Sequence, residues 1–64
     1  MKRYAVFAGR NYYPRGGWSD FQESFDTIPE ARLALTTGKI RKHDWWEIVD
    51  LTIGRIVEEG RTPW

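Results

Sequence analysis

The sequence predicts a small α+β domain in which one antiparallel sheet carries a single helix on one face. Three observations predict it: an apolar run near the N-terminus, a helix with a clear start signal, and two strand-like segments joined by a glycine-containing turn. Their order is ββαββ, and such elements pack most simply as one sheet with the helix across it. We interpret residues 1–64 as a single domain, because so short a chain supports one core only.

The first half of the sheet comes from two segments. Residues 3–8 are nearly continuous in apolar side chains, which is typical of a strand buried on both faces. Gly9 ends this strand. A second strand is predicted near residues 20–25, where Phe21, Glu23 and Phe25 alternate with Gln22 and Ser24.

The helix has signals at both ends. Thr27 and Glu30 have the spacing of a capping box, Pro29 is tolerated in the first turn, and Gly38 is a natural stop. Leu33 lies off the apolar face and is a candidate contact residue. The residues spaced to form that face are Ile28, Ala31, Ala34 and Leu35.

Two further strands are predicted at residues 44–50 and 55–59. Residues 50–54 between them suit a hairpin turn in which Gly54 takes the left-handed conformation.

Both faces of the third strand carry apolar groups. Trp45 and Val49 project to the side opposite Trp46 and Ile48. Because one helix covers one face only, we expect the other face to be a ligand surface or an interface with another copy.

Composition excludes several classes of function. The chain has no cysteine and one histidine, His43, which removes disulfides, thiol catalysis and most metal sites. We predict no cofactor and no metal, and expect His43 in a surface loop. The net charge of +1 argues against binding long nucleic acid. No apolar run approaches the roughly 20 residues of a membrane span, so we expect a cytoplasmic protein.

Small size and aromatic content point to self-association. Domains this short usually need disulfides, a metal or oligomerisation for stability. The aromatic share is 16%, with four tryptophans, so large side chains are available for packing between copies. We therefore expect a homo-oligomer, either a dimer or a tetramer.

The loop at residues 10–20 carries the candidate binding site. Aromatic rings provide surfaces on which bases stack, arginines pair with phosphate, and adjacent glycines let backbone amides approach an anion. An aspartate can accept from the donor edge of guanine. The candidate ligand-binding residues are Arg10, Tyr12, Tyr13, Arg15, Gly16, Gly17, Trp18 and Asp20. The same residue types also suit a loop that covers an open core, and this structural role stays open.

No catalytic set is recognisable. Glu47 and Asp50 lie in one strand at odd spacing and face opposite sides, and His43 has no identifiable serine or cysteine partner. We therefore expect a binding protein and not an enzyme.

The chain resembles a group of very small phage-encoded proteins. The resemblance rests on Tyr12-Tyr13-Pro14-x-Gly16-Gly17-x-x-Asp20, a YYPxGGxxD pattern, and on the segments 4–9, 25–27 and 44–50, so it covers most of the chain. The chain is similar to the anti-CBASS nucleotide sponges, which are oligomeric phage proteins. The resemblance implies that the chain binds a cyclic nucleotide messenger in the host bacterial cytoplasm without cleaving it.

Two other functions stay open. A small inhibitor of a host defence complex, of the anti-CRISPR or anti-restriction type, would use an exposed aromatic face, because protein interfaces are also rich in Trp, Tyr and Arg. A module for single-stranded nucleic acid would use the same aromatic residues, but the near-neutral charge counts against it.

Overall fold

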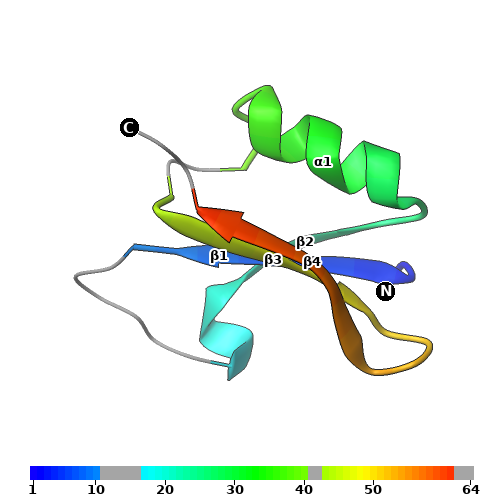
Figure 1. Ribbon diagram of the computed structural model, residues 1–64. Coiled ribbons are helices and arrows are strands. Elements are labelled where there is room, and N and C mark those ends of the chain that lie inside the picture. The colour runs from blue at the N-terminus through cyan, green and yellow to red at the C-terminus, as the bar shows by residue number, and fades with distance from the viewer. Residues whose placement is uncertain (11–16, 41–42, 62–64) are drawn as a thin grey trace.

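A computed structural model of the chain describes residues 1–10, 17–40 and 43–61. It contains four strands, one α-helix and one short 3-10 helix, and it confirms the predicted ββαββ order (Figure 1). The elements are β1 (Tyr4–Gly9), η1 (Gly17–Asp20), β2 (Phe21–Phe25), α1 (Ile28–Thr36), β3 (Trp45–Asp50) and β4 (Arg55–Arg61).

The strands form one antiparallel sheet in the order β2-β1-β3-β4. Helix α1 lies across one face, while η1 and the β3–β4 hairpin extend on the other side (Figure 1). We call these the helix face and the open face. Strands β2 and β4 are the two edges of the sheet.

Helix α1 begins and ends as its sequence signals predict. The backbone N–H of Glu30 donates to the Thr27 hydroxyl at 3.3 Å, and that hydroxyl donates to the Glu30 carboxylate at 3.0 Å. Gly38 follows the helix with a φ of +82°, which a residue with a side chain rarely adopts.

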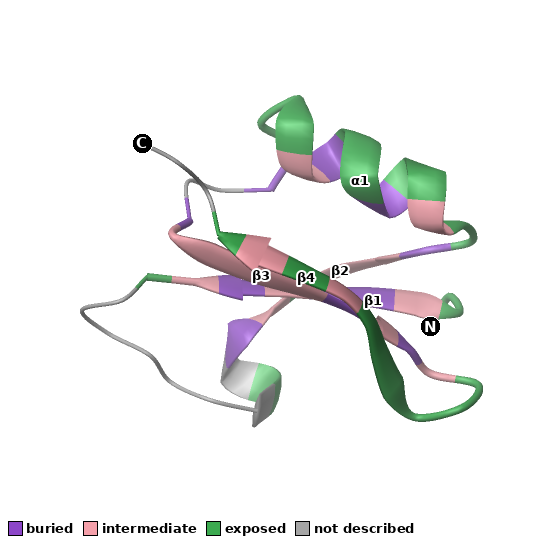
Figure 2. Cartoon of the chain, in the orientation of Figure 1, coloured by how far each residue is buried: buried purple, intermediate pink, exposed green. Residues whose placement is uncertain are grey.

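The core lies between α1 and the helix face. Figure 2 shows buried residues on the side of α1 that faces the sheet and exposed residues on its outer side. Ile28 and Leu35 pack at the edge of this core, and Leu33 is exposed, as predicted. The buried residues of the cluster are Val6, Ala8, Phe25, Ala31, Ala34, Ile40 and Ile48.

Each edge strand contains a β-bulge. In β2, Val6 pairs with Glu23 and Phe7 pairs with Phe21, so Gln22 is an extra residue. The bulge breaks the alternation of the strand: Phe25 lies in the helix-face core, whereas Phe21 packs against Phe7 at a centroid distance of 5.8 Å.

The bulge in β4 has the same form. Ile48 pairs with Glu58 and Val49 pairs with Ile56, so Val57 has no partner in β3. From this point to Arg61 the register of β4 is displaced by one residue relative to a regular hairpin.

The N-terminus is tied to the β3–β4 turn. Arg3 donates from two guanidinium nitrogens to the Asp50 carboxylate at 3.0 and 2.9 Å. The same carboxylate accepts the backbone N–H of Thr52 at 2.9 Å, and Gly54 closes the turn with a φ of +66°. The hydrogen bonds from Arg3 hold the pKa of Asp50 below its usual value, although burial opposes this shift.

Candidate functional site

Four of the eight predicted ligand-binding residues lie within the described structure. These are Arg10, Gly17, Trp18 and Asp20. The others, Tyr12, Tyr13, Arg15 and Gly16, lie outside the described residues. Gly17 opens η1, so the second half of the predicted loop forms a turn of helix.

Trp18 is displayed on the open face. Its side chain is 61% exposed, and its ring centroid lies 5.3 Å from that of Phe7 and 5.6 Å from that of Phe21. The three rings form an aromatic cluster that packs against the Trp18 indole, while much of Trp18 stays exposed. This geometry suits either stacking or protein contact.

Asp20 is placed differently. Its exposed fraction is 6%, and it lies where η1 passes into β2. Its backbone carbonyl accepts a 3.3 Å hydrogen bond from the Gln22 amide, which also donates to the Ala8 carbonyl at 3.0 Å. The burial favours a structural role for this carboxylate, and its contact with guanine stays a prediction.

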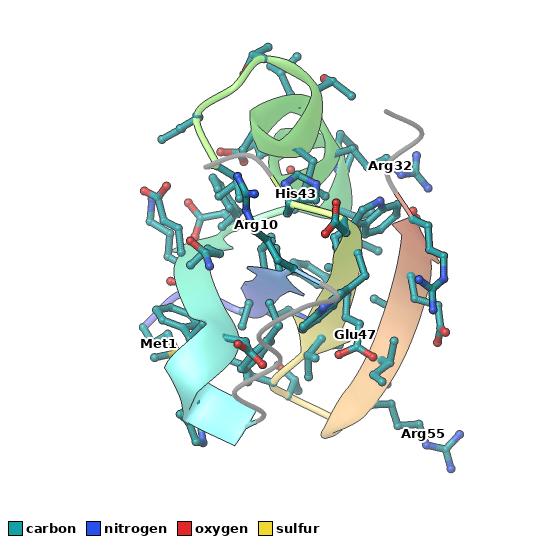
Figure 3. All side chains as sticks on the ribbon, turned by 90° about the vertical axis from the view of Figure 1, so that its left-hand side faces the viewer. Met1, Arg10, Arg32, His43, Glu47 and Arg55 are labelled. Carbon is teal, nitrogen blue, oxygen red and sulfur yellow. The ribbon has the colours of Figure 1, made fainter. Side chains whose placement is uncertain are left out.

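Arg10 lies where β1 leaves the sheet. The backbone N–H of Asp44 donates to the Gly9 carbonyl at 2.8 Å, which holds the segment before β3 against the end of β1. Figure 3 shows Arg10 near His43 at this end. The expectation of a surface position for His43 is wrong, because its exposed fraction is 4%: this segment is anchored against the fold instead of looping into solvent.

A pocket lies at the same end of the sheet, where β3 begins and β4 ends. Its volume is about 380 Å³, and it is lined by Trp45, Trp46, Glu47, Glu59, Gly60 and Arg61. We call it the β3–β4 pocket. Pockets for small molecules and cofactors typically measure about 300–1,000 Å³, so it falls at the small end of that range.

Glycines leave space for the indole rings of both tryptophans that line the pocket. A Cβ atom at Gly9 would lie 2.8 Å from Cζ2 of Trp45, and one at Gly60 would lie 2.7 Å from Cζ2 of Trp46. Each indole therefore crosses a neighbouring strand at a residue without a side chain. Trp46 packs against the helix-face core, whereas Trp45 lies on the open face, as their alternation predicted.

The register of β3 and β4 determines which charged groups of the pocket stand opposite each other. Glu47 stands directly opposite Glu59, and Trp45 stands directly opposite Arg61. Like charges opposite each other in a sheet are destabilising. The arrangement therefore places two acceptor groups together beside an indole and a guanidinium, at a cost in stability.

Sequence reasoning did not identify these pocket residues as a site. The sequence pattern pairs Glu47 only with Asp50 and does not single out Glu59. The pairing of Glu47 with Glu59 depends on the bulge at Val57, which residue types alone do not reveal. The available signals were the consecutive tryptophans, Trp45 and Trp46, and a glycine in the following strand, Gly60, which stands opposite Trp46.

The carboxylate of Glu58, also on β4, forms an ion pair within the fold. Arg32 of α1 donates to Glu58 at 2.8 Å and contacts its second oxygen as well. These hydrogen bonds lower the pKa of Glu58, against an opposing effect of burial. The pair joins the helix to β4 on the helix face and leaves Glu59 to the open face.

The fold and these surfaces define a small α+β domain with a helix-covered core and an open face bearing an aromatic cluster beside a pocket. The chain matches the family described as Bacteriophage T4 protein Y07C over residues 4–60, and it belongs to that family. This confirms the expectation of a phage protein family.

A second comparison identifies a relative in Enterobacteria phage T4. It is described as an uncharacterized 16.0 kDa protein in the segB-ipI intergenic region, and the two are 32% identical over 63 residues. The match covers 89% of this chain and 46% of the relative, so the chain spans about half the relative's length.

No solved structure matches the chain. Within the described residues, no helix is long and apolar enough to cross a membrane.

Proposed function

We propose that this phage protein is a non-catalytic binding protein that sequesters a nucleotide in the cytoplasm of the infected bacterium. The proposed ligand is a cyclic oligonucleotide second messenger, and the proposed active form is a homo-oligomer. The observation that carries the proposal is the β3–β4 pocket, which combines an indole, two carboxylates and a guanidinium in about 380 Å³.

Each group in the pocket matches one part of a nucleotide. Trp45 offers an aromatic surface, and stacking of a base on such a ring contributes about 1–3 kcal/mol. Arg61, directly opposite Trp45, is exposed and provides paired N–H donors for a phosphate.

The facing carboxylates supply base recognition. When ionised, the carboxylates of Glu47 and Glu59 accept hydrogen bonds and cannot donate, so they suit a base edge that donates. Guanine presents such donors, including its N2 amino group. A donor shared between the carboxylates also offsets their mutual repulsion, so part of the ligand's binding free energy comes from relief of a destabilised pair.

The predicted loop contributes to the same end of the sheet. Arg10 follows β1 at this end, and Trp18 packs on Phe7, whose partner across the sheet is Glu47. Trp18 is therefore an exposed aromatic surface on the open face, one strand away from the pocket.

The proposal is tested by thermal melting of the protein against cyclic dinucleotides, cyclic trinucleotides and linear mononucleotides. Binding to the folded state raises its stability by RT ln(1 + [L]/Kd), or about 2.7 kcal/mol when the ligand is at 100 times its Kd. We expect a shift with one or a few cyclic compounds, each recovered chemically unchanged. No shift with any compound, or recovery of a cleaved product, would overturn the proposal.

Variants of residues in the pocket and in the aromatic cluster test where the ligand binds. Trp45→Ala and the isosteric Glu47→Gln should abolish the shift if the pocket holds the nucleotide. Trp18→Ala tests whether the aromatic cluster also contributes to nucleotide binding. Leu33→Ala is the matched control, because Leu33 is 62% exposed on the outer side of α1 and should leave the shift unchanged.

A second candidate is an inhibitor that binds a host defence protein through the open face. The exposed side chain of Trp18 favours it, since tryptophan is a frequent anchor in protein interfaces. Under this alternative the nucleotide panel gives no shift, and Trp18→Ala weakens capture of the host protein while Trp45→Ala does not.

A further inference from the structure

The carboxylates on the strands of the sheet fall into two groups. The members of the first group each pair with a lysine or an arginine, and the pairs are Glu23–Lys39, Asp50–Arg3 and Glu58–Arg32. The second group is Glu47 and Glu59, and within residues 1–10, 17–40 and 43–61 neither forms an ion pair. The strand carboxylates that the described fold leaves without a cation therefore stand opposite each other and line the β3–β4 pocket.

The surroundings of this pair place it beside an aromatic surface. Glu47 is half-buried, with Phe7 opposite it on β1 and Glu59 opposite it on β4 (Figure 3). Trp45 lies two residues before Glu47 in the same strand and on the same face. Alternate residues of a strand are about 7 Å apart. A base that stacks on the Trp45 indole can therefore turn one edge toward both carboxylates.

Two facing carboxylates favour a base edge made of donors. Guanine presents its N1–H and its N2 amino group side by side, so each carboxylate receives a donor. Adenine and cytosine each present one amino group beside a ring nitrogen that accepts, and uracil presents one N–H between two carbonyl oxygens. An acceptor turned toward a carboxylate is left without a partner, and an unpaired polar group away from water is costly.

We infer that the β3–β4 pocket selects guanine, with Glu47 and Glu59 dividing the N1–H and N2 amino donors between them. This inference rests on the proposed function and names the class of ligand, a cyclic nucleotide that contains guanine. Like charges directly opposite in a sheet are destabilising, and donors placed between these two offset their repulsion. The same base thus satisfies both carboxylates at once.

The test compares ligands that differ in the base alone. Titration calorimetry measures the binding of cyclic di-GMP, cyclic di-IMP and cyclic di-AMP, and of the corresponding cyclic trinucleotides. Hypoxanthine, the base of the second compound, lacks the N2 amino group of guanine and keeps N1–H. A good two-point contact with a base discriminates by about 5- to 150-fold. We expect the guanine form to bind at least about fivefold more tightly than the adenine form, with the hypoxanthine form between them.

Two variants assign the selectivity to the carboxylates. Glu47→Gln and Glu59→Gln each keep the shape of the side chain and replace an acceptor-only group with an amide that also donates. Each should bind the guanine form at least about fivefold more weakly than the wild type does. Their melting temperatures without ligand should not fall, because each removes a like-charge contact. The control is Glu58→Gln, the same change on the helix face, which should keep the guanine affinity.

The outcomes separate this inference from the proposed function. An adenine form that binds as tightly as the guanine form overturns the selection of guanine, while the proposed capture of a cyclic nucleotide stands. An unchanged guanine affinity in both Glu47→Gln and Glu59→Gln overturns the role of the carboxylates. Binding of no cyclic compound overturns the proposed function and this inference together.

Discussion

Trp45 and Trp46 are neighbours in the chain and make the same local contact on opposite faces of the sheet. Each indole crosses a glycine of an adjacent strand, at Gly9 and Gly60 respectively. Trp46 lies on the helix face and packs against the core, whereas Trp45 lies on the open face, away from α1. The same side chain in the same setting is therefore used for stability on one face and is available for binding on the other.

The difference between the faces extends to their charges. On the helix face, Asp50 and Glu58 each accept hydrogen bonds from an arginine. On the open face, Glu47 and Glu59 face one another. One face satisfies its polar groups within the fold, and the other holds acceptors together at a cost in stability, which is typical of a binding surface.

The largest expected effect comes from Trp46→Ala. Removal of this large aromatic side chain from the edge of the core should lower the free energy of unfolding by about 3 kcal/mol, near the lower end for such truncations because Trp46 is only partly buried. Denaturant titration measures it. Trp45→Ala should cost clearly less, and equal costs for the two variants would contradict the division between the faces.

Adding a methyl group beneath each indole tests the same division with a smaller change. Gly60→Ala forces Trp46 to move within packed surroundings and should cost about 1–3 kcal/mol. Gly9→Ala moves Trp45 on the open face, so we expect a smaller loss of stability together with a change in ligand affinity. Unfolding curves and the nucleotide melting assay give the two readings.

The helix cap provides a test confined to the helix face. Thr27→Ala removes the hydroxyl that accepts from the Glu30 backbone and should cost about 0.5–2 kcal/mol. Thr27→Ser keeps an equivalent hydroxyl and is the control. Nucleotide affinity should be unchanged in both, and a parallel loss of affinity would show that the helix supports the pocket directly.

The smallest expected effect is a dependence of stability on pH through Asp50. Its pKa is lower in the folded state than in the unfolded chain, so the stabilisation is fully present above the unfolded-state pKa. It is lost as the pH falls through the folded-state pKa. Denaturant titrations from neutral to acid pH should show a weaker decline for Asp50→Asn, and an identical decline would assign the effect to other carboxyls.

The elements that depend on neighbouring residues were predictable from sequence. The capping box of α1, its buried face and the Gly54 turn follow from local spacing, and all three occur as expected. The bounds of the strands differ by one or two residues from those predicted, because a strand ends where its partner does. Local patterns do not contain that information.

The pocket depended on information that the local pattern lacks. Counting back from the turn, a regular hairpin pairs Glu47 with Glu58, but the bulge at Val57 shifts this partner to Glu59. In the same way, the bulge at Gln22 moves Phe21 away from the face of Phe25. Bulges arise where the twist of the sheet and packing on both faces must be reconciled, which is a property of the assembled fold.

The bulges in β2 and β4 also bear on how much of this protein a cell can hold. A protein that captures its ligand without destroying it works one for one, so the proposed function requires a high copy number. Crowding of sheet proteins favours joining of exposed edges into polymers. With an interruption in each edge strand, the chain can accumulate to the level of its target while each copy keeps its own sheet.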